Sequence, residues 1–337
     1  MTTERRSNTP EPDETLKVAV VFPGQGSQSI GMASKVLAIH PDGEQRFSAA
    51  SKILGYDLLK LIEEGPESDL DNTAYSQPAI YTASIAWWDA LREQWTAHGR
   101  VIDPVAMAGH SMGQITALVA ANALDFENGL RLVRERGRLM NEADQRRPGG
   151  MASIIGLRDR VLRTIVGEAS VEGTVVVANE NGPGHTVVSG EESALRRVMH
   201  LAERSGARRV VRLPISIASH SPLMDEAQAQ FRQAVDAMPW VDPQVPVISN
   251  FSAHLIESRK AIIEELDTAL LRPVDWNSSV KRMVHSGAGL FVEAGPGDVL
   301  TKLVRRIAKT AWTFPISDDD AGLATRDYPD MSDGIPK

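Results

Sequence analysis

The chain has 337 residues, of which 42% are hydrophobic and 24% charged, a composition typical of a globular protein with a sizeable core rather than of a disordered chain. It contains no cysteine, so disulfides, thiolate catalysis and cysteine-ligated zinc are excluded, and a reducing cytoplasm is the expected location. The formal net charge of −8 gives no general reason to expect binding to nucleic acid.

Both ends of the chain are expected to lack fixed structure. Residues 1–16 are polar and contain no apolar segment of the kind found in secretory signals. Residues 318–337 form an acidic tail with six aspartates and no periodicity, which predicts a flexible segment. Between the two ends, no apolar run reaches the roughly 18 residues that a membrane span requires, so we expect no membrane association.

The first half of the chain predicts two strands that each end in a glycine turn. "LKVAVVFPGQG" begins with a β-branched run and breaks at Pro23-Gly24, which indicates a buried strand followed by a loop. "PVAMAGHSMGQITALVAANALD" predicts a short strand, a sharp turn and a helix over about 112–123. Asp125 then has the position of an N-cap for the following amphipathic helix.

The middle of the chain has a different pattern, with three strand-rich stretches around helical segments near 158–168 and 191–205. We interpret residues 148–215 as an inserted, ferredoxin-like α+β subdomain. Strands alternate with helices on both sides of the insertion, which favours a mostly parallel sheet. The expected fold is therefore α/β, with an α/β-hydrolase-like large subdomain built from residues 17–147 and 216–317.

Gly109-His110-Ser111-Met112-Gly113 matches G-x-S-x-G, the pattern of a nucleophile elbow. A serine on a cramped strand-to-helix turn needs small neighbours, and the next backbone amide then faces any oxyanion that develops. The alternative is a glycine-flanked turn with an unreactive serine. The apolar strand before the turn and the alanine-rich helix after it favour the nucleophile.

A nucleophilic serine needs a base, and His220 in "SIASHSPLM" lies downstream of Ser111, the order found in α/β-hydrolase-like enzymes. His110 adjoins the serine, but neighbours on such a turn point in different directions. Other histidines occupy polar or helical surroundings and are expected at the surface: His40, His98, His200, His254 and His285. No spacing typical of metal ligands appears, so no metal is predicted.

"PGQGSQ" lacks the G-K-[ST] ending of a phosphate loop and the third glycine of a dinucleotide fingerprint. A better hypothesis is that this glycine loop supplies a second backbone N–H to an oxyanion site.

Taken together, these pieces resemble one family, the malonyl-CoA:acyl carrier protein transacylases and the related acyltransferase domains of polyketide synthases. The matching stretches occur in the family's order and cover about residues 17–310. They are "VFPGQGSQ", "YSQPAIY", "AGHSMGQITALVAANAL", "LVRERGRLMNEA", "GGMASIIGL", "PGHTVVSG", "SIASHSPLM", "RPVDWNSSV" and "EAGPGDVL".

The resemblance implies a ping-pong acyl transfer from an acyl-CoA to the phosphopantetheine thiol of an acyl carrier protein. Ser111 would carry the acyl group and His220 would be the general base and acid. A backbone carbonyl, at the position of Asp275, would orient the histidine. Backbone amides of Gln25 and Met112 would form the oxyanion hole.

The resemblance also implies that Arg136 holds the free carboxylate of malonyl, for which a planar guanidinium is well suited. Spacing alone does not distinguish it from its neighbours Arg131, Arg134 and Arg138. Gln77 and Asn179 match residues near the family's active site. No cofactor is implied beyond the coenzyme A thioester, which is substrate, and we expect a monomer.

Three positions depart from the family's pattern. Gln114 replaces the usual Glu, Met112 stands where Leu is common, and His185 takes the place of a frequent Gln. These changes, and the tetrapeptide "IASH", leave the acyl group open. The alternatives are a discrete polyketide acyltransferase with another acyl group or an acyl-carrier donor, a serine thioesterase or editing hydrolase, and an inactive scaffold protein.

Overall fold

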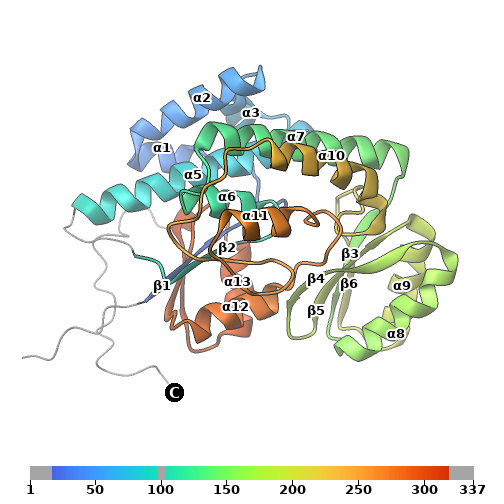
Figure 1. Cartoon of the computed structure of the whole chain (residues 1–337). Coiled ribbons are helices and arrows are strands. Elements are labelled where there is room, and N and C mark those ends of the chain that lie inside the picture. The colour runs from blue at the N-terminus through green and yellow to red at the C-terminus, as the bar shows by residue number, and fades with distance from the viewer. Residues whose placement is uncertain (1–16, 98–102, 319–337) are drawn as a thin grey trace, which may run out of the picture.

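A six-stranded sheet lies at the centre of the larger part of the computed structural model, which describes residues 17–97 and 103–318 (Figure 1). Its strand order is β10-β9-β1-β2-β7-β8, and every pair is parallel except β7 with β8. The prediction of a mostly parallel sheet is confirmed. The strands are β1 (Val18–Phe22), β2 (Ala106–Gly109), β7 (Val247–Ile248), β8 (Leu255–Ile256), β9 (Leu290–Glu293) and β10 (Trp312–Pro315).

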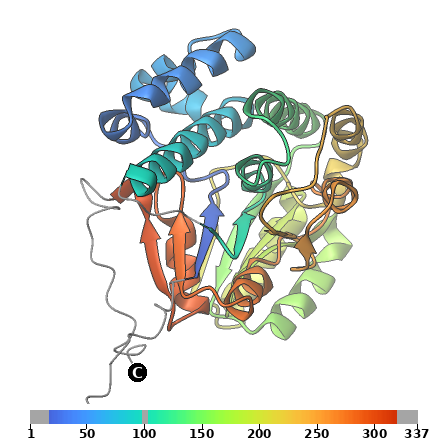
Figure 2. The same cartoon turned by 60° about the vertical axis from the view of Figure 1, so that its left-hand side comes forward.

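Helices cover both faces of this sheet (Figures 1 and 2). The helices of this part of the molecule are α1 (Ser34–Ile39), α2 (Glu44–Leu54), α3 (Leu58–Glu64), α4 (Glu67–Leu70), α5 (Thr73–Ala97), α6 (Gly113–Ala120), α7 (Phe126–Arg146), α10 (Asp225–Asp236), α11 (Arg259–Leu266), α12 (Trp276–His285) and α13 (Val299–Ile307). Of these, α1 to α4 form an outer group that packs on α5 and α7 rather than on the sheet. The predicted N-cap of α7 is present, because the Asp125 side chain accepts a hydrogen bond from Asn128 N.

Alternate residues of β1 point to opposite faces of the sheet, as the pleat requires. Val20 and Phe22 belong to the core that the sheet forms with α5, α6 and α7. Ala19 and Val21 belong to a second core with α12 and α13. All five residues of β1 are buried, which explains its continuous apolar sequence.

A second sheet lies beside the first and is antiparallel, with strand order β4-β5-β3-β6. Its elements follow one another as βαββαβ, and their apolar faces form a separate core. They are β3 (Gly150–Ile155), α8 (Asp159–Ala169), β4 (Val175–Gly182), β5 (His185–Gly190), α9 (Glu192–Arg204) and β6 (Arg209–Arg212).

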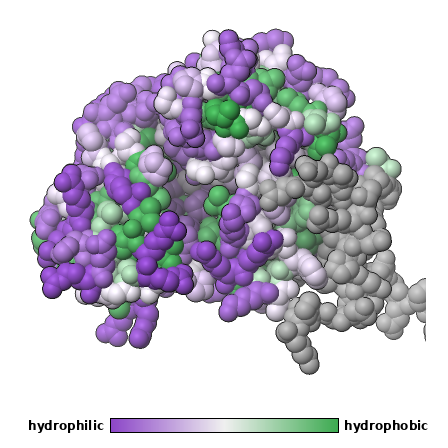
Figure 3. Space-filling view, turned by 180° about the vertical axis from the view of Figure 1, so that it is seen from behind, coloured by the Kyte–Doolittle hydropathy of each residue, from purple (hydrophilic) through white to green (hydrophobic). Residues whose placement is uncertain are grey.

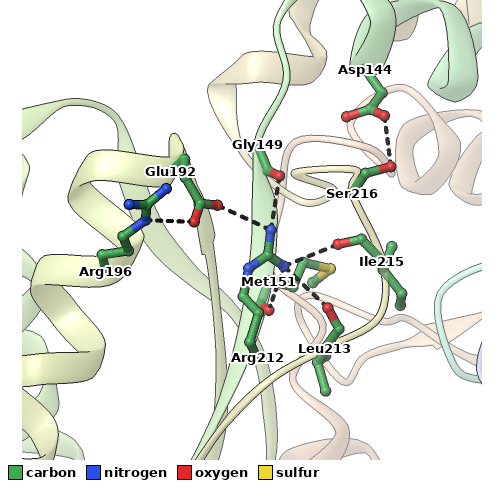
Figure 4. A network of polar contacts seen from close by, with 9 residues as sticks. All are labelled: Asp144, Gly149, Met151, Glu192, Arg196, Arg212, Leu213, Ile215 and Ser216. Atoms are coloured by element: carbon green, nitrogen blue, oxygen red, sulfur yellow. Dashed lines mark hydrogen bonds and ion pairs between the residues drawn. The ribbon is translucent and has the colours of Figure 1, made fainter.

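Arg212, at the end of β6, joins the two segments that lead into and out of this sheet (Figure 4). Its Nη1 donates to the carbonyls of Met151, Leu213 and Ile215 at 3.1–3.2 Å. Its Nη2 donates to Gly149 O at 3.1 Å and to the Glu192 carboxylate at 3.2 Å. One guanidinium therefore holds both connecting segments together.

The predicted tails, residues 1–16 and all but the first residue of 318–337, lie outside the described residues. Within the described part, no helix has the length and apolar character needed to cross a bilayer. The face in Figure 3 is mainly hydrophilic, with smaller hydrophobic areas and a hollow near its centre.

Candidate active site

Ser111 lies on the sharp turn between β2 and α6, with a left-handed backbone φ of 54°. The flanking glycines are required by close backbone contacts. A Cβ on Gly109 would lie 1.8 Å from Gly113 O, and a Cβ on Gly113 would lie 2.3 Å from Phe22 O. The spacing of the G-x-S-x-G pattern thus has the steric cause that the sequence predicted.

His220 is the histidine that meets this serine. Its Nε2 lies 2.8 Å from Ser111 Oγ, and its Nδ1 lies 2.9 Å from the carbonyl oxygen of Arg272. Because a carbonyl only accepts, Nδ1 carries the proton and Nε2 is free to accept one from the serine. His220 is buried, with 3% of its surface exposed.

The orienting carbonyl is that of Arg272, so the prediction of Asp275 for this role is wrong. Asp275 caps α12 instead, where its side chain accepts from Ser278 N. Its own carbonyl accepts from Ser279 N and from the Ser279 hydroxyl in the first turn of that helix. The Asp275 carbonyl is therefore already bonded within the first turn of α12. The carbonyl that faces His220 is that of Arg272.

The pKa of His220 is lowered to about 3, first by burial and then by the positive charge of Arg136. The imidazole is therefore neutral at neutral pH, which is the form that a general base must have. The same lowered pKa makes it a weak base.

Arg136 projects from α7 into the site and is 3% exposed. Its Nη2 donates to Ser111 Oγ at 3.1 Å, and its Nη1 donates to Gln77 Oε1 at 2.9 Å. Gln77 is held in turn by Met140, whose sulfur accepts from Nε2 at 3.4 Å. Burial lowers the pKa of Arg136 to about 10, so it stays charged at neutral pH. No carboxylate of the described residues forms an ion pair with it, whereas a buried cation ordinarily needs an anion.

A cavity of about 370 Å³ opens onto these residues. Besides Ser111, Arg136 and His220, three further predicted residues line it: Gln25, Met112 and Asn179. Met112 precedes the first residue of α6, so its backbone N–H belongs to the N-terminus of that helix. The side chain of Gln25 is fixed by donation to Thr73 Oγ1 at 2.9 Å. Asn179 is buried on β4, across the cavity, and pairs with Val274.

Sequence reasoning missed several lining residues, and His110 is one of them. Its Nε2 lies 3.0 Å from Asn181 Oδ1, and its ring contacts Trp276 at a centroid distance of 5.5 Å. His185, noted only as a departure, also lines the cavity, and its Nε2 lies 3.1 Å from the Ser153 hydroxyl. No local pattern marks these two residues, because each meets a partner elsewhere in the chain, Asn181 of β4 for His110 and Ser153 of β3 for His185.

Asn250 is a further residue that the sequence did not indicate. Its Oδ1 accepts from Ser111 N at 2.8 Å, and its Nδ2 donates to Gly109 O at 2.7 Å. Gln114 lies beside it, with Oε1 accepting from Asn250 Nδ2 at 2.7 Å and Nε2 donating to Ile248 O at 2.9 Å. Gln114, one of the three departures from the family's pattern, therefore belongs to the hydrogen bonds that hold the serine turn.

The arrangement unites a serine hydroxyl, a neutral histidine and a buried unpaired cation. Such a set suits acyl transfer through a serine ester, with a preference for an acyl group that carries an anion. Among the described residues, no group of three or more His, Asp or Glu side chains is placed to hold a metal ion.

Comparison with known proteins gives a consistent result. Residues 19–331 match the family model of the acyl transferase domain. A malonyl CoA-acyl carrier protein transacylase from Escherichia coli O157:H7 is 39% identical over 306 residues, which cover 91% of this chain and 97% of that protein.

Solved structures agree with the sequence match. The malonyl CoA-acyl carrier protein transacylase of Coxiella burnetii has a TM-score of 0.85 and 37% identity, covering 90% of this chain and 94% of that one. A malonyl-transacylase solved in complex with its type II polyketide synthase acyl-carrier protein has a TM-score of 0.85 and 38% identity, covering 90% and 96%.

Proposed function

This chain belongs to the acyl transferase domain family, and we propose that it transfers a malonyl group from coenzyme A to the phosphopantetheine thiol of an acyl carrier protein. One observation carries the proposal. Ser111 Oγ lies between a base, His220 Nε2 at 2.8 Å, and a buried cation, Arg136 Nη2 at 3.1 Å. The relatives are named for malonyl transfer, and one was solved with its carrier protein.

In the first half-reaction, Ser111 Oγ attacks the thioester carbonyl carbon and its proton passes to His220 Nε2. Backbone N–H groups of Met112 and Gln25 stabilise the oxyanion, with the helix N-terminus of α6 adding to the effect. The C–S bond then breaks, and His220 returns the proton to the coenzyme A sulfur. The products are the malonyl-serine ester and free coenzyme A.

In the second half-reaction, the phosphopantetheine thiol of the carrier attacks the serine ester. His220 Nε2 takes the thiol proton, and the same amides stabilise the second oxyanion. The C–O bond breaks, and the proton passes from His220 to Ser111 Oγ. The serine is regenerated, so each cycle moves one acyl group between two thiols.

Arg136 supplies specificity in this scheme. Its buried guanidinium pairs with the free carboxylate of malonyl, and Gln77 fixes its orientation through Nη1. Because the charge of Arg136 lowers the pKa of His220, a bound carboxylate also relieves that effect and makes the base stronger. Malonyl binding thus raises the basicity of the histidine that catalyses malonyl transfer. Asn179 lies across the cavity, where it can contact the acyl or pantetheine chain.

We also propose that the two sheets belong to two known architectures. The βαββαβ order and the antiparallel order β4-β5-β3-β6 support a ferredoxin-like subdomain over residues 148–215. The strand–serine turn–helix unit of a parallel sheet supports an α/β-hydrolase-like large subdomain, residues 17–147 and 216–317. The absence of cysteine is consistent with a cytoplasmic location.

Mass spectrometry of the intact protein tests the proposal. Incubation with malonyl-CoA should add one malonyl group, and addition of a holo carrier protein should remove that group and add it to the carrier. A panel with acetyl-, methylmalonyl- and succinyl-CoA defines the acyl group. Rapid loss of the adduct in water without a carrier would instead indicate a thioesterase, and the absence of any adduct would indicate a scaffold protein.

A further inference from the structure

Glu265 is a buried acid that the proposed reaction does not use. It lies on α11, is 3% exposed, and accepts hydrogen bonds from Gln114, Ser249 and Asn250, which lie near the serine turn. Its Oε1 accepts from Asn250 N at 2.7 Å and from Gln114 Nε2 at 3.4 Å. Its Oε2 accepts from Ser249 Oγ at 2.6 Å. The carboxylate therefore fixes the two residues that follow β7.

Asn250 connects this carboxylate to the nucleophile. Its side chain bonds the peptide groups on both sides of His110, accepting from Ser111 N and donating to Gly109 O. Ser111 has a φ of 54°, a conformation that a residue with a side chain rarely adopts without support from its surroundings. Asn250 gives this support, and its own position depends on Glu265.

We infer that Glu265 is a positioning residue for the nucleophile, acting through Asn250 to hold the Ser111 turn. The inference rests on the proposed role of Ser111. Glu265 does not touch Ser111, so its effect depends on the reach of its oxygens to Asn250 N rather than on contact with reacting atoms.

Two conservative substitutions of Glu265 separate the effect of its side-chain length from the effect of its carboxyl group. Glu265→Gln keeps the length of the side chain and an acceptor for Asn250 N, and the Ser249 hydroxyl can rotate to accept from the new amide. Glu265→Asp keeps the carboxyl group but withdraws the oxygens by about 1.5 Å, one carbon–carbon bond. If the length of the Glu265 side chain positions the serine turn, Glu265→Asp should slow the labelling of Ser111 more than Glu265→Gln does.

The test is the rate at which a fluorophosphonate probe labels Ser111 in the full-length protein, read by mass spectrometry. We expect Glu265→Asp to slow labelling at least about ten-fold, since a displacement of about 1 Å can have a large effect on a reacting group. Glu265→Gln should label within about three-fold of the wild-type rate. Glu264→Asp is the matched control, because Glu264 is exposed on the same helix and pairs with the exposed Lys260. It should label at the wild-type rate.

A double-mutant cycle tests the route through Asn250. Asn250→Ala should itself slow labelling at least about ten-fold, and Glu265→Asp should add little in that background. Unchanged labelling in Glu265→Asp, full additivity with Asn250→Ala, or a loss confined to Glu265→Gln would each overturn the inference. Should Glu265→Asp unfold at the assay temperature, Asn250→Ala decides alone, and wild-type labelling there would overturn it.

The probe also separates this inference from the proposed function. Fluorophosphonate labelling does not require malonyl recognition or a carrier. If Ser111→Ala is labelled as fast as the wild type, Ser111 is not the nucleophile and the proposed function fails. If only the Glu265 and Asn250 variants behave as the wild type, the proposed function stands and the positioning role fails.

Discussion

Ser111 and His220 face each other across 2.8 Å, and both have a left-handed backbone, with φ of 54° and 57°. Residues other than glycine adopt this conformation at a cost and keep it only where their surroundings determine it. Here Asn250 holds the serine, and the Arg272 carbonyl holds the histidine ring. The strain at both ends of the contact is consistent with a pre-organised nucleophile and base.

Replacing the nucleophile should remove the acyl-enzyme without unfolding the protein. We expect Ser111→Ala to show no malonyl adduct by intact-mass spectrometry, with a melting temperature close to that of the wild type. Removing such a nucleophile typically leaves only a residual catalysis of about 10³–10⁴ over water. Ser153→Ala, at another serine of the cavity, is the control and should still be acylated. An adduct on Ser111→Ala would refute the mechanism.

The pH dependence of acylation should reflect the depressed basicity of His220. Burial, followed by the charge of Arg136, lowers the pKa of His220 to about 3. A lowered pKa means that the neutral form persists to lower pH, so the acylation rate at malonyl-CoA concentrations below KM, which reports the free enzyme, should stay level from pH 8 to about pH 5. A histidine with its ordinary pKa of about 6.5 would lose activity over that range. Stopped-flow acylation measures this, and a midpoint near 6.5 would contradict the prediction.

Arg136 should discriminate between charged and uncharged acyl groups. Arg136→Ala should lower kcat/KM for malonyl-CoA by about 10²–10³, since an unpaired buried charge costs about 3–5 kcal/mol and each ~1.4 kcal/mol is ten-fold. The rate with acetyl-CoA should hold or rise. Arg138→Ala is the control, because Arg138 is exposed on the same helix and pairs with Glu135 and Glu142. Equal losses with both substrates would assign Arg136 a structural role.

Carrier docking should depend on the basic end of α13. Arg305 and Arg306 are exposed there, and Leu300 and Leu303 of the same helix line the cavity. Carrier proteins of this kind are acidic, so reversing both arginines to Glu should raise the KM for the carrier, most strongly at low salt. Acylation by malonyl-CoA should be spared. The same double reversal at Arg196 and Arg197 on α9 changes the net charge equally and is the control. Equal effects from both pairs would indicate that net charge, not a docking site, is responsible.

Arg212 should contribute to stability rather than to docking, because its guanidinium is already bonded to four backbone carbonyls and Glu192. Arg212→Ala should lower the free energy of unfolding by about 1–3 kcal/mol, the usual effect of losing hydrogen bonds to a charged group. Arg196→Ala loses only an exposed ion pair with Glu192 and should change it by less than about 0.5 kcal/mol. Denaturant unfolding measures both, and equal effects would show that the bonded carbonyls add no stability.

The parts of the site that depend on local chain geometry could be predicted from the sequence. Gly109 and Gly113 are needed because the backbones around the serine turn touch, and that requirement appears as a short pattern in the chain. The run Val18–Phe22 predicted a buried strand because both faces of a parallel sheet are covered. The resemblance to the family supplied His220, Arg136 and Gln77, which the structure brings together around Ser111.

The groups that surround these residues could be identified only from the folded structure. The carbonyl that orients His220 is 52 residues further along the chain, and Asn250 is separated from Ser111 by 139 residues. Glu265 meets Gln114 across 151 residues. These contacts depend on how α6, β7 and α11 pack. They also depend on the start of α12, where the Asp275 carbonyl is bonded within the helix and the Arg272 carbonyl is not. Such relationships leave no periodicity or spacing in the sequence, because each partner satisfies an ordinary local pattern of its own.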